Sequence, residues 1–194
     1  MKIILASKSG VRKKILDEHG IDCEVVHSNV DEEEIKTSLL NAGADPLLIS
    51  KNLAELKSIK VSSRHPDKYV LGADSVISLN NDLINKPNSR DEAFRILKKL
   101  NSSKHYLISS VCISKNGSMI WNHTDSSELK MKDLSDNEIL EYLNKIKTET
   151  LLAYGVYQIE AEGLKLFEYI KGDHNSIMGL PIKDIINYIK QIRK

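Results

Sequence analysis

The sequence has few aromatic residues and no long hydrophobic run. Phe, Trp and Tyr make up 5% of the 194 residues, so the core must consist of aliphatic side chains. Every apolar run is far shorter than the roughly 20 residues that span a bilayer. The segment 3–6 is also too short to be the hydrophobic part of a secretory signal. We therefore expect no membrane segment and a cytoplasmic location.

Cysteine and net charge are also low. Cys23 and Cys112 lie far apart in apolar segments and lack the close spacing of metal ligands, so we expect a reduced, buried pair. The 28 basic side chains are nearly balanced by 27 acidic ones. Without a basic excess, and with few aromatic residues on which bases could stack, the chain is not expected to bind DNA or RNA.

Short apolar runs alternate with helical patterns along the whole chain. Strands are predicted at 3–6, 23–26, 69–73, 105–114, 118–130 and 164–170. The run 76–79 continues the third strand past a kink at Asp74, and turns are expected at Asn80–Asp82 and at Asn116-Gly117. Mixed strands and helices predict an α/β fold with a mixed sheet, formed as one domain over residues 1–194.

Helix starts are marked by capping residues. Asp45 followed by Pro46 is typical of a first helical turn. The segments Ser89–Glu92 and Ser135–Glu138 both have the form of a capping box. Further helices are expected after Gly10 and after Pro181, because isoleucine and leucine recur there with helical spacing.

The junction between the first strand and the first helix is rich in small, hydroxyl and cationic residues. Ser7, Ser9 and Gly10 precede a helix that carries Arg12 one turn in. A helix N-terminus presents free N–H groups and partial positive charge, so this pattern suits a phosphate chain. A capped surface helix with solvated cations would have the same sequence, so both interpretations stay open on these residues alone.

Several charged positions have two interpretations. Asp74 is expected at the carboxyl end of a buried strand, where α/β proteins place ligands, or as a turn aspartate. The acidic run 31–34 is either a solvated surface or, together with Asp74, the source of carboxylates for a divalent metal. Lys57 and Lys86 are isolated cations of the kind usually found at the surface, although Pro87 stiffens the loop that carries Lys86.

The segment 158–162 contains two further acids. Glu160 and Glu162 are two residues apart in a predicted strand-turn-strand pattern, so they share a face with Gln158. An edge strand with a polar face explains this arrangement.

The order of these features resembles the Maf family over nearly the whole chain, from about residue 3 to residue 189. The matching segments are ILASKSGVRKKIL, VDEEE, NLAELKSIKV, LGADSVISLNNDLINKP, DEAFRILKKLNSSKHYLISSV and VYQIEAEGLKLFEYIKGDHNSIMGLPI. The resemblance implies an elongated, two-lobed α/β fold related to the inosine triphosphatases, with a cleft between the lobes. It also implies hydrolysis of a nucleoside triphosphate to a monophosphate and pyrophosphate with Mg²⁺ or Mn²⁺. Members often form dimers, so a homodimer is one expected assembly.

The resemblance implies phosphate-binding residues at the first helix. Ser7, Ser9 and Arg12 match the family's S-x-S-x-x-R motif. Most members carry an arginine where this chain has Val11, and Lys13 is expected to substitute for it in part.

The remaining matches imply the catalytic residues. Glu32 matches the acid after the second strand, Lys57 the lysine of the second helix, and Lys86 the lysine before proline. Asp74 matches the proposed proton acceptor, and Glu32 and Asp74 are the implied metal ligands. Glu160 lies where many members have glutamine and where a subgroup that includes 7-methyl-GTP pyrophosphatases has glutamate.

A second function remains open at the level of sequence. A protein of the same fold that binds nucleotides without hydrolysing them would be a regulator of cell division. Val11 in place of arginine favours that alternative, whereas the joint presence of Glu32, Lys57, Asp74 and Lys86 favours the enzyme.

Overall fold

The computed structural model describes residues 2–159 and 162–192 and contains one mixed β-sheet. The strands are β1 (Ile3–Leu5), β2 (Cys23–Val25), β3 (Val70–Leu79), β4 (Asp82–Ile84), β5 (Lys104–Lys115), β6 (Ser118–Met131) and β7 (Phe167–Lys171). Their order is β2-β1-β3-β5-β6-β7, with β4 paired to β3. The pairs of β1 with β2 and β3 are parallel and the other pairs are antiparallel, which confirms the predicted mixed α/β class.

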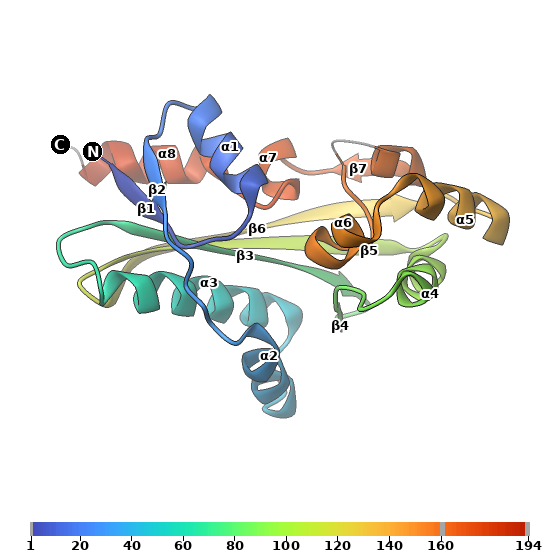
Figure 1. Cartoon of the computed structure of the whole chain (residues 1–194), viewed down its shortest axis with the longest axis horizontal. Coiled ribbons are helices and arrows are strands. Elements are labelled where there is room, and N and C mark those ends of the chain that lie inside the picture. The colour runs from blue at the N-terminus through green and yellow to red at the C-terminus, as the bar shows by residue number, and fades with distance from the viewer. Residues whose placement is uncertain (1, 160–161, 193–194) are drawn as a thin grey trace.

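Helices cover both faces of this sheet (Figure 1). They are α1 (Gly10–Glu18), α2 (Glu32–Asn41), α3 (Pro46–Ser62), α4 (Arg90–Leu100), α5 (Asp136–Lys145), α6 (Thr148–Tyr154), α7 (His174–Ile177) and α8 (Ile182–Ile192), with a 3₁₀ helix at Glu162–Leu166. α3 lies on one face, whereas α1 and α8 lie on the other. None of the helices in the described ranges is long and apolar enough to cross a membrane.

The side-chain alternation of the strands explains this layering. Ile3 and Leu5 of β1 pack with α1 and α8, whereas Ile4 and Ala6 point to the opposite side and contact Val61 of α3. Because side chains alternate across a strand, one short apolar run supplies both faces. Cys23 and Cys112 are buried free thiols, as predicted.

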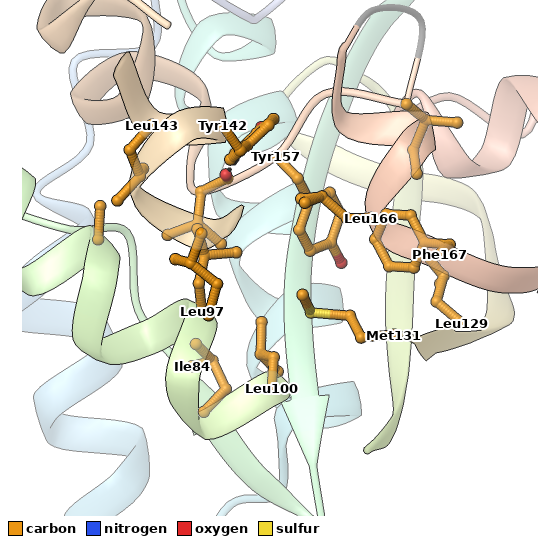
Figure 2. Packing of buried hydrophobic residues seen from close by; sticks show 14 of the residues in the cluster. Ile84, Leu97, Leu100, Leu129, Met131, Tyr142, Leu143, Tyr157, Leu166 and Phe167 are labelled. Carbon is orange, nitrogen blue, oxygen red and sulfur yellow. Dashed lines mark hydrogen bonds between the residues drawn. The ribbon is translucent and has the colours of Figure 1, made fainter. Parts of the chain in front are cut away.

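The molecule is elongated and holds two main hydrophobic clusters. One joins β1 and the first half of β3 to α1 and α8. The other joins the distal ends of β3 and β6 to α4, α5 and α6, and Figure 2 shows Leu97 of α4, Leu143 of α5 and Met131 of β6 within it. The long strands β3, β5 and β6 contribute residues to both clusters, so one continuous sheet connects the two ends of the molecule.

Several predicted elements are confirmed with small shifts. Ser9, Asp45, Ser89 and Ser135 each cap a helix through a side-chain oxygen that accepts a backbone N–H. The turn after β3 is formed by Asn80 and Asn81, both with positive φ. A left-handed conformation at these two positions matches the predicted hairpin.

Other sequence predictions were wrong. β3 is continuous from Val70 to Leu79, so Asp74 lies within the strand and not at its end. Antiparallel pairing with β5 extends from Val70 to Ser78, whereas β1 reaches only Leu71, so Asp74 lies just beyond the end of β1.

Three helices, namely α2, α6 and the four-residue α7, and one strand start were also missed. α2 has no buried residue and α6 buries only Leu151, so neither shows the apolar stripe that a sequence search detects. The predicted strand at 164–170 begins only at Phe167, because Glu162–Leu166 forms the 3₁₀ helix. Glu162 binds Lys165 there, so the expected alternating face with Glu160 does not form at Glu162.

Candidate active site

A cavity of about 460 Å³ opens between the two hydrophobic clusters. Five cationic and two acidic side chains are among the described residues that line it: Lys8, Arg12, Lys36, Lys57, Lys86, Glu32 and Asp74. Apolar side chains, among them Leu83, Leu107, Val156, Tyr157 and Ile177, form another part of its wall. The cavity therefore combines a charged region with an excess of positive charge and an apolar region.

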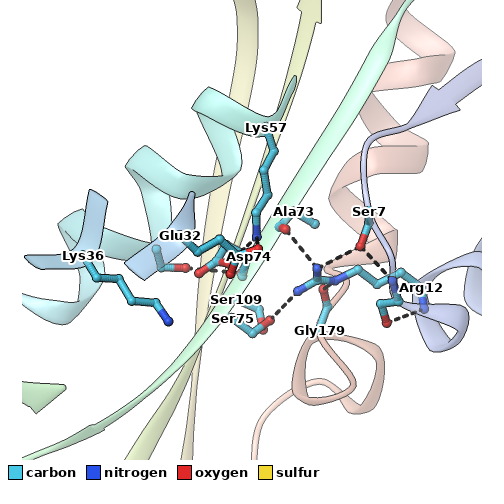
Figure 3. A network of polar contacts seen from close by, with 12 residues as sticks. Ser7, Arg12, Glu32, Lys36, Lys57, Ala73, Asp74, Ser75, Ser109 and Gly179 are labelled. Carbon is cyan, nitrogen blue, oxygen red and sulfur yellow. Dashed lines mark hydrogen bonds and ion pairs between the residues drawn. The ribbon is translucent and has the colours of Figure 1, made fainter. Parts of the chain in front are cut away.

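At the centre of the charged region, one lysine joins two carboxylates (Figure 3). Lys57 Nζ lies 2.7 Å from Asp74 Oδ1 and 2.9 Å from Glu32 Oε1. The side chains of Lys57 and Asp74 are each 7% exposed. Asp74 Oδ2 is buried and has no hydrogen-bond partner among the described residues, so one carboxylate oxygen is available to a ligand.

Gly72 makes this arrangement possible. A Cβ at position 72 would lie 2.2 Å from the backbone oxygen of Ala54 and 2.8 Å from the backbone nitrogen of Ser58. α3 therefore packs directly on the backbone of β3, and Lys57 of α3 reaches Asp74 two residues further along the strand. Glycine is required because the two backbones approach too closely for any side chain.

Glu32 enters the cavity from the first turn of α2. The carboxylate of Asp31 caps that helix by accepting the N–H of Glu34 at 3.0 Å. Burial alone would raise the pKa of Glu32, but the Lys57 ammonium outweighs it, and the pKa lies below its ordinary value. Glu32 is therefore an anion at neutral pH.

Arg12 connects the charged region to three other segments of the chain. Its Nε donates to Gly179 O at 2.9 Å, Nη1 donates to Ser7 Oγ and Ala73 O, and Nη2 donates to Ser75 Oγ at 3.0 Å. Four hydrogen bonds leave one of the five guanidinium N–H donors for a ligand. Burial lowers the pKa of Arg12, and the charges of Asp74 and Glu32 offset part of this effect.

The N-terminus of α1 lines the cavity. Ser9 caps the helix by accepting the N–H of Arg12, and Ser7 Oγ accepts the N–H of Ser9 at 3.2 Å. Ser7, Ser9 and Arg12 all lie in the cavity wall. The capping and anion-binding interpretations are therefore compatible, because Ser9 caps the helix and still lies in the cavity wall.

Lys86 and Lys13 have different surroundings. Lys86 lines the cavity, and its Nζ donates to Ala153 O at 2.8 Å. Desolvation lowers the pKa of Lys86, and the charge of Glu32 offsets part of this effect. Lys13 is not among the lining residues, because its side chain pairs with Asp17 on the outer face of α1. The structure therefore does not bring Lys13 into the site.

Three further residues differ from the sequence prediction or lie beyond its test: Glu160, Glu162 and Lys36. Glu160 lies outside the described residues, and Glu162 pairs with Lys165 outside the cavity lining. Lys36 lines the cavity but was not predicted. Its position four residues after Glu32 places both on one face of α2, and that spacing would have identified it had α2 been predicted.

Glu32 and Asp74 are the carboxylates that could hold a divalent cation. Within residues 2–159 and 162–192, no group of three or more His, Cys, Asp or Glu side chains is arranged around a metal position. Mg²⁺, however, is commonly bound by one or two carboxylates together with substrate phosphates. Glu32, the more exposed of the two, would fit such a cation beside Asp74 once phosphate oxygens complete its coordination.

A family model and two relatives match nearly the whole chain at the level of sequence. A family model described as Maf-like protein matches residues 2–192. The nucleoside triphosphate pyrophosphatase of Pelagibacter ubique (strain HTCC1062) is 56% identical over 99% of this chain and 98% of its own length. The 7-methyl-GTP pyrophosphatase of Brucella suis biovar 1 is 34% identical over 98% of this chain and 96% of its own length. Among solved structures, a HAM1 protein from Coxiella burnetii aligns over 68% of this chain and 73% of its own, at 14% identity and a TM-score of 0.44.

Proposed function

The chain belongs to the Maf family, and on that basis we propose that it is a nucleoside triphosphate pyrophosphatase. The reaction converts a nucleoside triphosphate and water to a nucleoside monophosphate and pyrophosphate. The single observation that carries the proposal is the Glu32–Lys57–Asp74 cluster in a cavity beside the N-terminus of α1. In this arrangement a carboxylate that can accept a proton from water lies beside positive charges that can bind a triphosphate.

In the proposed reaction, Asp74 is the general base. Lys57 holds Oδ1 at 2.7 Å, which orients the carboxylate and leaves Oδ2 without a protein partner. A water oxygen bonds to the phosphorus next to the nucleoside, its proton passes to Asp74 Oδ2, and the bond to the pyrophosphate oxygen breaks. Such positioned proton transfer contributes about 10²- to 10⁴-fold to rates.

The other charged residues bind and orient the phosphates. The N-terminus of α1 and Lys86 both line this cavity, and their positive charge favours negative charge there. Ser7 and Ser9 complete the phosphate-binding part of the wall. A divalent cation held by Glu32, which at 41% side-chain exposure is more open than Asp74, would supply further charge neutralisation at the phosphate oxygens.

The proposal is tested by pyrophosphate release with Mg²⁺ from dTTP, UTP, CTP, GTP, ITP and 7-methyl-GTP. We expect release from at least one of them, and the preferred nucleotide identifies the base that the apolar part of the cavity accepts. In Asp74→Asn, release should fall at least about 100-fold. Asp136→Asn is the matched control, because Asp136 is an exposed acid on α5 outside the cavity.

The non-catalytic alternative makes the opposite prediction. A folded protein that binds one of these nucleotides, measured by calorimetry, but releases pyrophosphate from none of them would overturn the proposed reaction. The same result would leave a nucleotide-binding regulator as the function.

A further inference from the structure

Lys36 is a cavity residue whose charge the proposed reaction does not use. It lies on α2 one turn after Glu32, and its side chain is only 12% exposed. Figure 3 shows it extending from α2 alongside the Glu32–Asp74 pair. Because ammonium groups are rarely shielded from water without a partner, this position needs an explanation.

The other shielded cations of the cavity already have acceptors in the protein. Arg12 makes four hydrogen bonds, Lys57 is shared by Glu32 and Asp74, and Lys86 donates to Ala153 O. Lys36 Nζ contacts Glu33 Oε1 at 3.0 Å, and the Glu33 side chain is 77% exposed. Glu33 occupies one of the three N–H donors of the ammonium from the solvent side, so the other two remain for a ligand.

Packing does not explain the position of Lys36 either. α2 has no buried residue, so its stability does not depend on an apolar face that the lysine stem would complete. Lys36 also lies near a second ammonium. The pKa of Lys86 is lowered first by desolvation, and the charge of Lys36 contributes to the lowering. Glu32 is the protein's anion beside both ammoniums, because its pKa, which burial alone would raise, is lowered by the charges of Lys57, Lys36 and Lys86 together. One carboxylate shared by three cations leaves an excess of positive charge, which an anionic ligand would balance.

We propose that Lys36 is a substrate-binding residue, which donates hydrogen bonds to the phosphate chain of the nucleoside triphosphate. This inference rests on the proposed function and extends it to α2. The chemical class that Lys36 recognises is a linear polyphosphate, present both in the substrate and in the pyrophosphate product. α2 then contributes two groups on one face, with Glu32 binding the cation and Lys36 binding the phosphate.

This role differs from that of a residue that only stabilises α2. Lys36→Gln should raise the KM for the preferred nucleotide about tenfold, which corresponds to one charge-assisted hydrogen bond. The kcat should change much less, because the ammonium binds phosphate both before and during the reaction. Inhibition by pyrophosphate or by the nucleoside monophosphate should weaken in parallel, which shows the part of the phosphate chain that Lys36 contacts.

Two further variants separate binding from helix stability. Lys36→Arg keeps the charge and should restore most of the affinity. Glu33→Gln removes the partner of Lys36 and should leave the KM unchanged or lower it, because the ammonium becomes freer to bind phosphate. If the role were only structural, Glu33→Gln and Lys36→Gln would have the same effect.

The decisive measurement is calorimetric binding of pyrophosphate and of the nucleoside monophosphate to the wild type and the three variants, together with steady-state kinetics. Unchanged KM and unchanged affinity for both products in Lys36→Gln would overturn the role of Lys36 while the wild type remained active. Equal losses in Lys36→Gln and Glu33→Gln would also overturn it. Failure of the proposed function is a separate result, seen as no pyrophosphate release by the wild type.

Discussion

Arg12 connects four parts of the chain through one guanidinium group. Its acceptors are Ser7 Oγ, two atoms of β3 at Ala73 and Ser75, and the backbone oxygen of Gly179 before α8. The planar fork of arginine reaches these acceptors from one position, which a single ammonium cannot do. Arg12 therefore positions the walls of the cavity in addition to offering one donor to a ligand.

We predict that Arg12→Lys destabilises the protein. The backbone oxygens of Ala73 and Gly179 would lose their donors, and the free energy of unfolding should fall by about 2–3 kcal/mol. The kcat/KM for pyrophosphate release should fall as well, because β3 carries Asp74. Urea unfolding and steady-state kinetics measure the two effects.

The matched control is Lys13→Gln. Lys13 is the next residue on α1, but it pairs with Asp17 outside the cavity, so both quantities should stay near the wild-type values. Equal effects of the two variants would contradict the role given to Arg12.

At the scale of elements, the contact between α3 and β3 determines the geometry of the cluster. Lys57 is on the helix and Asp74 is on the strand, so their 2.7 Å contact depends on how closely the two elements pack. Gly72 sets that approach, because its Cα faces the backbone of α3 at Ala54 and Ser58.

We predict that Gly72→Ala moves α3 away from β3. A Cβ placed 2.2 Å from a backbone oxygen cannot be relieved by rotating a side chain, so the helix must shift. Stability should fall by about 2–3 kcal/mol, and pyrophosphate release should fall with it. Thermal unfolding and the same kinetic assay test both expectations.

Gly10→Ala is the control for this substitution. A Cβ at Gly10 meets no atom within 4 Å, and Gly10 is the first residue of α1. Its unfolding free energy should change by less than about 1 kcal/mol. A large loss in both glycine variants would show that the close approach at Gly72 is not the cause.

At the scale of the whole molecule, a buried histidine links the distal cluster to the cavity wall. His105 of β5 is 0% exposed, and its Nε2 lies 2.9 Å from the hydroxyl of Tyr157, which lines the cavity. Burial lowers the pKa of His105 from 6.5 to about 4. The folded protein therefore keeps this imidazole neutral at a pH where the unfolded chain protonates it.

This difference predicts a pH-dependent stability. Above pH 6.5 the histidine has no effect, because it is neutral in both states. As the pH falls from about 6.5 to 4, the unfolded chain binds a proton that the folded chain does not, so stability decreases by up to about 3 kcal/mol. Urea unfolding between pH 5 and 7 measures this slope.

His105→Gln tests the assignment. Glutamine can still form a hydrogen bond with Tyr157 but does not titrate, so the variant should show a flatter dependence over the same range. The window above pH 5 also lies above the pKa of Glu32, which is lowered from 4.5 because the Lys57 cation outweighs burial. The same slope in the variant and the wild type would contradict the assignment to His105.

Local sequence determined most of the elements and a large part of the candidate site. Capping residues such as Ser9, Asp45 and Ser135 act on the N–H groups of the next few residues, so they are recognisable without knowledge of the fold. The asparagines at the hairpin turn act over a similarly short range. Resemblance to the Maf family identified Glu32, Lys57, Asp74 and Lys86, all of which line the cavity.

Which charged side chains lie together in the cavity depends on tertiary packing. Arg12 and Lys13 are neighbours in sequence, but one points into the cavity and the other outward, because successive residues of a helix differ by about 100° in direction. Lys36 belongs to a helix that lacks an apolar stripe, so its place beside Glu32 depends on how α2 meets α3. These positions follow from packing between segments distant in sequence, and short-range patterns carry no information about that packing.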